Sequence, residues 1–432
     1  MCINSLRLEK RKEMKKIKLP FHYAWVVVVA TILMNFFYAI VYSSFGMYGA
    51  SILAKFPDMS RTSYSLVPTL HSVWCTVFLL AYGSIVKKLG FRKVIFLGGL
   101  GLTAGYIIYS LANNITMFYV GTFFVGMFPA FCSSSTTGAL FTRWFGKNNT
   151  TLLSISMAIG GFGGTIGANI VGKWLSTIGY EASFRNCAIL TAVVMLVIAL
   201  LVQNDPKDVG TEMLWASEVE NKEAAEGEKP GYTLKQAMKT YNFWAMVGIF
   251  LLFAAAFYAA YANVTLYMAD LGWDPTVYGA IFGVINTANV IAMLCGGYIV
   301  DKIGARITIL VLCACYAAVA FILGFTTPTV PMMYLVSVLL GICWLFCKVL
   351  HTPLALCFGK KDTPAIIAIL TSCITVGASV GIPVANIVYD ATGSYAALFK
   401  GLLGVLVICL IFAFTGVRKV KGYDKVGGPD AK

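Results

Sequence analysis

Charged residues are scarce in this sequence. Asp, Glu, Lys and Arg make up 12% of its 432 residues, whereas 59% are hydrophobic and the mean hydropathy is +0.79. A soluble globular protein is about 25% charged, so this chain lacks the polar surface that water requires. The net charge of +14 does not indicate nucleic-acid binding either. The basic residues lie at the ends of apolar runs, where they orient a membrane protein.

The apolar runs contain almost no carboxylates, and the cysteines do not form metal-binding motifs. None of the twelve cysteines belongs to a CxxC pair, and the spacings Cys313–Cys315 and Cys343–Cys347 do not fit a metal knuckle. A membrane enzyme would need His, Asp or Glu residues clustered within reach of one another. We therefore expect no metal, no cofactor and no enzymatic activity.

One glycine-rich segment imitates a phosphate-binding loop. Gly167, Gly172 and Lys173 have part of the required spacing. However, Trp174 stands where Ser or Thr would bind the magnesium ion, and no strand precedes the segment. The sequence therefore predicts no ATP site.

Long apolar runs dominate the chain. A helix that spans a bilayer needs about 20 mostly apolar residues, and twelve runs of this kind are present. They predict an all-α integral membrane protein with spans near 22–47, 64–86, 93–112, 116–141, 150–178, 184–203, 241–269, 276–300, 307–326, 330–358, 364–389 and 395–417.

The polar segments divide the spans into two sets of six. The segment 204–240 holds many of the acidic residues and no apolar run, so it is typical of a linker. All but six of the 33 Lys and Arg residues fall on one side of the spans, which predicts that both termini are cytoplasmic. The expected organisation is a tail at 1–20, a six-helix bundle at 21–203, the linker at 204–240, a second bundle at 241–417 and a tail at 418–432.

A short motif recurs at an interval of 214 residues, which indicates a duplicated unit. Its first copy follows the second span and its second copy follows the eighth. Glycine permits a tight turn between helices, and an acidic residue near a helix end pairs with basic residues. We expect these loops to gate the cytoplasmic face; they contain Gly83, Lys87, Lys88, Gly90 and Arg92, and Gly297, Asp301, Lys302, Gly304 and Arg306.

These loops resemble the signature G-x-x-x-[DN]-[RK]-x-G-[RK]-[RK] of the major facilitator superfamily. The resemblance implies the major facilitator fold: twelve transmembrane helices in two pseudo-symmetric six-helix bundles, with alternating access to a central cavity. Further marks are similar to the monocarboxylate-transporter-like and oxalate–formate exchanger group. These marks are Phe45-Gly46, Phe56 to Ser63 with Ser60-Arg61, Arg143-Trp144-Phe145, Ala269-Asp270-Leu-Gly272-Trp273 and Tyr389-Asp390-Ala-Thr392-Gly393-Ser394-Tyr395.

Three residues depart from that family pattern. Lys87 stands where the first gating loop usually has Asp. Met293 occupies the place of an Arg that is thought to bind the substrate carboxylate in such carriers, and Asn289 replaces an acidic residue one turn earlier. The departures leave the substrate class and proton coupling open.

Lys348 is the main candidate for binding an anion, because a charge inside a membrane span is costly and therefore a functional candidate. In a continuous helix, Trp344, Lys348 and His351 would share one face. An ammonium beside an indole and an imidazole suits a small carboxylate. The alternative is that Lys348 snorkels to the inner interface.

Other polar residues within the spans are candidates to line a cavity. His71 could titrate near neutral pH and couple protons, or it could be a hydrogen-bonded structural histidine. Tyrosine and asparagine at this depth need polar partners, which a wet cavity or a neighbouring helix supplies. These candidates are Asn35, Tyr38 and Tyr42 in the first span, Tyr258 and Tyr261 in the seventh, and Asn286 and Asn289 in the eighth.

The resulting prediction is a secondary active transporter that moves a small organic anion, in particular a monocarboxylate, by proton symport or anion exchange. An alternative is the transport or export of a larger apolar or neutral solute, and a membrane sensor without transport is a further one. Coupled protons and the lipid bilayer are the expected partners, without nucleic acid. We expect a multi-pass monomer in the cytoplasmic membrane.

Overall fold

The computed structural model describes residues 22–42, 45–146, 148–215, 231–359, 361–420 and 423–424. The predicted tails at 1–20 and 418–432 lie largely outside these ranges, as does the middle of the linker. Within the described residues, twelve helical segments are long and apolar enough to cross a membrane, and no strand is present. The predicted all-α membrane fold is therefore confirmed.

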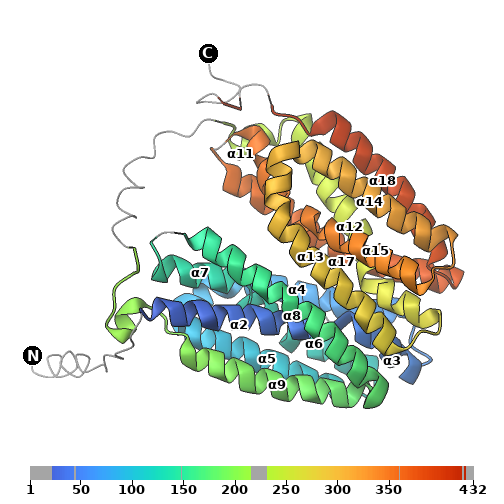
Figure 1. The fold of residues 1–432 in the computed structure, drawn as a ribbon, viewed down its shortest axis with the longest axis horizontal. Helices are drawn as coiled ribbons and strands as arrows, with labels where there is room; N and C mark the ends of the chain where they lie inside the picture. The colour runs from blue at the N-terminus through green and yellow to red at the C-terminus, as the bar shows by residue number, and fades with distance from the viewer. Residues whose placement is uncertain are drawn as a thin grey trace, which may run out of the picture.

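The helices form two bundles that the linker connects (Figure 1). The first bundle contains α2 (Ala24–Tyr42), α3 (Tyr48–Lys55), α4 (Arg61–Leu89), α5 (Phe91–Ser110), α6 (Ile115–Phe131), α7 (Ser134–Trp144), α8 (Asn149–Thr177) and α9 (Gly179–Leu201). The second contains α12 (Tyr241–Asp270), α13 (Pro275–Ile303), α14 (Ala305–Phe325), α15 (Val330–Lys348), α16 (His351–Ala355), α17 (Thr363–Thr392) and α18 (Ala396–Gly416).

Two of the predicted spans are interrupted rather than continuous. The fourth span breaks between α6 and α7, where Pro129 lies in the last turn of α6 and Cys132 leaves the helical conformation. The tenth breaks after Lys348, because Val349 and Leu350 form a turn before α16 begins at His351. The span predicted over 330–358 is confirmed by its length and hydropathy, and within it His351 begins the separate short helix α16.

Glycine-mediated packing shows the internal repeat directly. A Cβ on Gly163 or Gly167 of α8 would lie 2.1 or 2.2 Å from a carbonyl oxygen of α2. The glycines 214 residues later, Gly377 and Gly381 of α17, approach carbonyl oxygens of α12 in the same way, at 2.6 and 2.1 Å. Small residues permit such close helix approach in membranes, so each bundle has the same central helix pair.

The two gating loops also have one geometry. Gly90 and Gly304 each end one helix and begin the next, with φ of 79° and 85°. Glycine adopts this region without the penalty that a Cβ brings. The duplication predicted from the sequence therefore extends to the backbone conformation of the turn.

The described parts of the linker attach to equivalent places on the two bundles. Leu214 exchanges backbone hydrogen bonds of 3.0 and 2.8 Å with Trp144 and Gly146 after α7. On the other bundle, Tyr232 donates to the carbonyl of Phe358, 2.8 Å away. The two attachment points, near residues 145 and 359, are again 214 residues apart.

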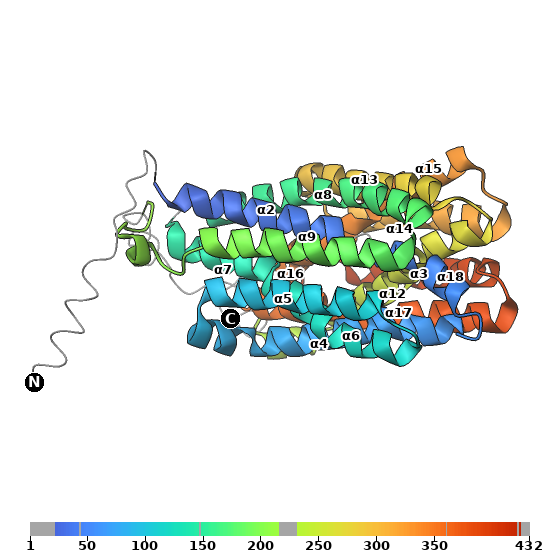
Figure 2. The same ribbon diagram turned by 90° about the horizontal axis from the view of Figure 1, so that it is seen from below.

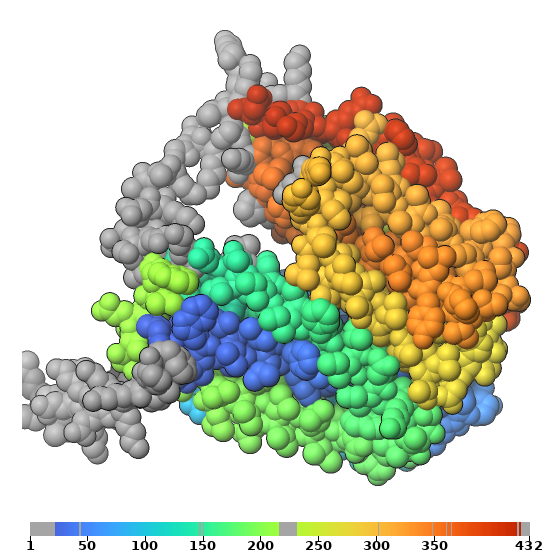
Figure 3. Space-filling view, viewed as in Figure 1, coloured from blue at the N-terminus to red at the C-terminus, as the bar shows by residue number. Residues whose placement is uncertain are grey.

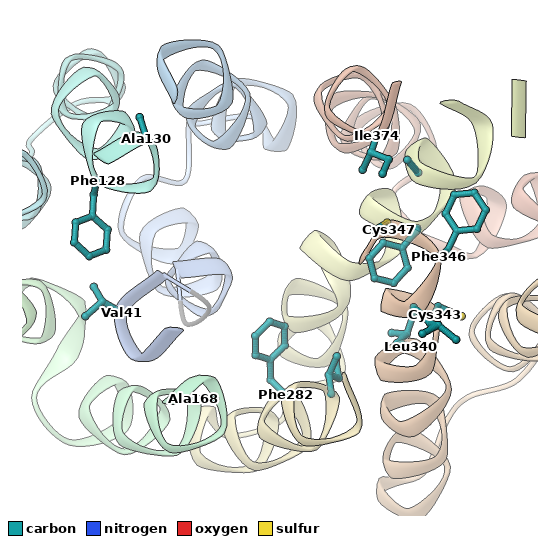
Figure 4. Close-up of a cluster of buried hydrophobic side chains, with 14 of the residues drawn as sticks. Val41, Phe128, Ala130, Ala168, Phe282, Leu340, Cys343, Phe346, Cys347 and Ile374 are labelled. Atoms are coloured by element: carbon teal, nitrogen blue, oxygen red, sulfur yellow. The ribbon is translucent and has the colours of Figure 1, made fainter. Parts of the chain in front are cut away.

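The bundles meet at one end and diverge toward the end where the linker lies (Figure 1). Figure 2 shows the long helices of both bundles running between these two ends. Figure 3 shows a hollow between α7 of the first bundle and the second bundle on the diverging side. One cluster of buried apolar side chains includes residues of both bundles. In Figure 4, Val41 and Phe128 lie in the first bundle and Leu340 and Phe346 in the second, and Phe282 lies on α13, where the bundles approach each other.

The contact between α8 and α2 predicts a pair of contrasting glycine variants. Gly163→Ala should destabilise the fold by about 1–3 kcal/mol, because the new methyl group would overlap the Phe36 carbonyl. Gly83→Ala is the matched control, since no atom lies within 4 Å of its Cβ position. Thermal unfolding in detergent should show a lower midpoint for Gly163→Ala alone, and equal midpoints would contradict the packing.

Candidate functional site

Arg61, the first residue of α4, joins the two bundles at the end where they meet. Its Nη2 forms an ion pair with Asp270 at the end of α12, and its guanidinium lies over the Tyr389 ring, 3.7 Å from the centroid. The Arg61 and Asp270 side chains are 16% and 31% exposed, compared with 43% for each partner of the surface pair Lys55–Glu181. Solvent screens the Arg61 pair less, so it contributes more than an exposed pair.

Asp390 caps the first turn of α4 from the opposite bundle. Its two carboxylate oxygens accept from the backbone amides of Arg61 and Thr62, at 3.2 and 2.9 Å. Ser60 accepts from the amide of Ser63 at 3.0 Å and supplies the remaining cap. The first amides of a helix lack intrahelical partners and carry partial positive charge, so a carboxylate is favoured there. The start of α4 is thus completed by a residue of α17.

A buried hydroxyl–amide network extends this contact into the second bundle. The Tyr395 hydroxyl accepts from Arg61 Nη1 at 3.1 Å and lies 3.2 and 3.0 Å from the amide oxygens of Asn263 and Asn386. Burial raises the pKa of Tyr395 above its ordinary value, so the group stays a neutral hydroxyl that both donates and accepts. We call Arg61, Asp270, Asp390 and Tyr395 the latch.

The contact between α8 and α13 continues the interface between the bundles from the latch end toward the middle of the spans. Thr165 hydrogen-bonds to Thr287 at 2.8 Å, and Gly172 of α8 lies against Gly279 of α13, so that a Cβ on Gly172 would be 3.2 Å from the Gly279 Cα. The contact reaches as far as Gly161 and Val290. These contacts lie along the segments of α8 and α13 that lead away from the latch end, so the bundles are closed at one end.

Aromatic side chains of both bundles face one another at mid-depth. Tyr38 stacks on Tyr42 at 4.9 Å in α2, and Trp344 of α15 meets Tyr258 and Tyr261 of α12 at 5.7 and 5.2 Å. All five side chains are half-buried although they lie at mid-span. We call the space between the two tyrosines of α2 and the aromatic group of α12 and α15 the chamber.

His71 of α4 completes the wall of this chamber. Its ring centroid lies 5.4 Å from that of Tyr42, and it is 8% exposed. Its buried Nε2 has no hydrogen-bond partner among the described residues. A buried imidazole nitrogen without a partner is costly unless a solute, water or proton reaches it, so His71 remains a candidate for contact with the transported species.

The span-10 candidates are separated by the helix break. The Trp344 ring faces the chamber tyrosines, whereas Lys348 is the last residue of α15 and its side chain lies outside the described part of the structure. His351 begins α16 beyond the turn. The two residues of the turn, Val349 and Leu350, keep dihedral angles of the right-handed helical region.

Two of the three asparagines predicted to line the cavity donate hydrogen bonds within their own bundles. The Asn35 amide donates to Thr137 and Ser156, both at 3.0 Å, and the residue is 2% exposed. The Asn286 amide donates to the Phe282 carbonyl at 3.2 Å. Asn289 packs against Gly341 of α15, and its buried Oδ1 has no partner in the described structure.

The gating loops lie at the diverging end, and the hydrogen bonds of their described residues stay within one bundle. Arg92 donates its backbone amide to Asn204 at 3.1 Å, and Arg306 donates to the Phe414 carbonyl at 3.0 Å, each within one bundle. Lys87, Lys88 and Lys302 are exposed. Gly83 and Gly297 have open space beside them, and the side chain of Asp301 lies outside the described part.

Sequence reasoning did not identify the latch as a unit. Its residues belong to three separate family-like marks, around Arg61, Asp270 and Asp390, that are more than a hundred residues apart. Arg61 is one of the few basic residues on its side of the spans, and this rarity was the available signal. Nothing in the sequence paired it with particular carboxylates.

Metal ligands are not gathered anywhere in the described residues. No group of three His, Cys, Asp or Glu side chains is close enough to hold an ion. The carboxylates instead cap helices, as Asp274 and Asp390 do, or form ion pairs, as Asp270 does. Outside the spans, the hydrogen bonds that Asp274 accepts from Thr276 hold its pKa below the ordinary value, so this cap at the start of α13 stays charged at neutral pH.

Two helical bundles related by a repeat, closed at one end around a chamber, define a polytopic membrane transporter class. The family model described as Major Facilitator Superfamily matches residues 25–356. The chain therefore belongs to the Major Facilitator Superfamily. No curated protein sequence matches it.

Solved structures share this fold at low sequence identity. A bacterial homolog of the human lysosomal transporter Spinster, described as inward-facing and occupied, aligns with a TM-score of 0.71 at 12% identity, over 93% of this chain and 98% of that one. The nucleoside transporter NupG aligns with a TM-score of 0.68 at 13% identity, over 91% of this chain and 100% of that one. These similarities establish the fold alone.

Two aspartates at the latch end offer a matched test of the latch. Asp390→Asn removes the charge that caps α4 from the other bundle and should disfavour the closed end by up to about 1 kcal/mol, or about fivefold in population. Asp274→Asn alters a cap within one bundle and should not. Electron-spin distances between labels at Thr177 and Thr326 should lengthen or broaden only for Asp390→Asn; an unchanged distribution would contradict the latch.

Proposed function

We propose that this protein is a secondary active transporter that moves a small organic anion, in particular a monocarboxylate, by alternating access. The closed latch end would face outward, and the diverging end would face the cytoplasm. Both termini would lie on the cytoplasmic side of the cytoplasmic membrane. The excess of Lys and Arg at the diverging end supports this orientation. Proton symport or anion exchange would drive the transport.

The aromatic chamber is the observation that carries the proposal. It lies between half-buried tyrosine side chains of the first bundle and tyrosine and tryptophan side chains of the second. On the latch side, the Arg61–Asp270 ion pair joins the two bundles. A solute bound there would touch both bundles at once. Any rocking of one bundle against the other would then depend on the solute, which is the requirement for coupled transport.

Lys348 supports an anionic substrate. It ends α15 four residues after Trp344, whose ring contacts Tyr258 and Tyr261. A lysine within a span is expensive unless it serves a charged partner. The aromatic rings would hold the carbon end of a carboxylate, and the ammonium would neutralise its charge.

Transport would require the latch to open while the other end closes. Opening separates Arg61 from Asp270 and Asp390, and it exposes the amides that Asp390 now caps. Water replaces these partners in the outward-open state, so the net cost is far smaller than the gross strength of the bonds. The hydrogen bonds between α8 and α13 change in the same movement.

His71 is the chamber residue best placed for proton coupling. It contacts Tyr42, and its Nε2 has no protein partner in the described structure. Protonation would place a positive charge in the chamber and favour an anion there. Exchange of one anion for another needs no such group, so the His71 variant separates the two coupling modes.

A larger neutral solute is the second candidate. The chamber side chains that the structure describes carry no formal charge, and Met293 stands where related carriers have an Arg. An uncharged aromatic wall binds planar or apolar groups well. Competition of neutral aromatic solutes with a monocarboxylate in one assay distinguishes the two candidates.

Lactate uptake into proteoliposomes tests the proposal. Lys348→Ala should raise KM at least about tenfold, because it removes a charge-assisted contact with the anion. Trp344→Ala should raise KM by about 2- to 12-fold through lost aromatic packing. Trp244→Ala is the matched control, since Trp244 is 56% exposed and its indole bonds to Met238 in its own bundle.

Failure has a clear form in this assay. An absence of saturable uptake for lactate, pyruvate, formate and oxalate would reject the monocarboxylate carrier. Equal KM values for Lys348→Ala and the parent would show that Lys348 does not bind the anion. Neutral solutes that accumulate in a Trp344-dependent manner would support the second candidate instead.

A further inference from the structure

A cavity of about 480 Å³ opens beside the latch, between α3 of the first bundle and α12 and α13 of the second. Its volume is in the range of about 300–1,000 Å³ that is typical of small-molecule sites. It is distinct from the chamber, since none of the chamber aromatics lines it. Both partners of the Arg61–Asp270 ion pair line this cavity.

The cavity wall has two chemically different parts. Leu53, Leu266 and Trp273 contribute apolar side chains to the lining, and Arg61 contributes a cationic one. Ser51 and Tyr278 add hydroxyl groups. This combination suits a small molecule with one carboxylate and a short carbon chain, because a guanidinium binds carboxylates through paired N–H donors.

In this structure, the Asp270 carboxylate is the anion paired with the Arg61 guanidinium. Its side chain is 31% exposed, so once displaced it can be solvated without leaving a buried charge. Asp390 holds the backbone amides of α4 and does not line the cavity. Exchange of carboxylates on Arg61 would therefore release the α4–α12 contact and leave the α4–α17 contact in place.

We propose that this cavity is a vestibular binding site for a small carboxylate, which displaces Asp270 from Arg61 and so loosens the latch from outside. The choice of a carboxylate rests on the proposed function, whereas the site itself rests on the cavity and the ion pair. The solute would then act on the gate before it reaches the chamber. Affinity should be weak, because Asp270 competes as an intramolecular ligand.

The two partners of the ion pair should respond in opposite directions. In a shared Lys348→Ala background, sodium lactate is titrated against sodium chloride at equal ionic strength, and the unfolding midpoint is followed. Asp270→Asn removes the competing charge, so the apparent Kd for lactate should fall about fivefold or more. Arg61→Gln removes the guanidinium that would bind the lactate carboxylate, so it should abolish the lactate-dependent shift of the unfolding midpoint. If the ion pair were purely structural, both variants would change the lactate response of the unfolding midpoint in the same direction.

Glu181→Gln is the matched control, because it removes a carboxylate from the ion pair with Lys55 at the same end but outside the cavity. Its lactate response should equal that of the background. Equal responses of Asp270→Asn and Arg61→Gln, or a response that survives in Arg61→Gln, would overturn the vestibular site. Uptake by Lys348→Ala tests the chamber separately, so failure of one proposal is distinguishable from failure of the other.

Discussion

The ties between Arg61 and the second bundle are the constraint on which the conformation depends. One guanidinium is paired with Asp270, stacked on Tyr389 and bonded to Tyr395, and Asp390 completes the helix that begins with the same residue. These contacts bring α4, α12 and α17 together at one end. The bundles are joined at this end and diverge at the other (Figure 1). The chamber between them therefore opens toward the diverging end.

Rigid bundles make such a local contact effective over the whole molecule. In each half, glycines of the fifth or eleventh span bring its backbone against the first or seventh, as Gly163 and Gly377 show. A close-packed helix pair resists deformation. Movement is therefore concentrated at the interface between bundles, where polar contacts such as Thr165–Thr287 exchange readily with water.

The sequence predicted much of the fold and only parts of the site. Hydropathy located the twelve spans, and the 214-residue interval predicted the repeated turn at Gly90 and Gly304. The candidate tyrosines of α2 stack on each other and those of α12 pack against Trp344, whereas Asn35 bonds inside its own bundle. Helical periodicity gives the direction of a side chain within one helix but not the identity of the neighbouring helix. The break after Lys348 had a signal in Pro353, which has no amide hydrogen to donate to the Val349 carbonyl four residues earlier.

By itself, the sequence determined the membrane-spanning class, the number of spans, the duplication and the charge asymmetry, because each follows from local composition or from spacing along the chain. Only the tertiary structure decided which distant residues meet: that Arg61 joins two aspartates of the other bundle, and that a cavity lies beside them. The physical reason is that an ion pair or a cavity depends on distances of a few ångströms between helices. Those distances are set by the packing of whole bundles, which no local pattern encodes.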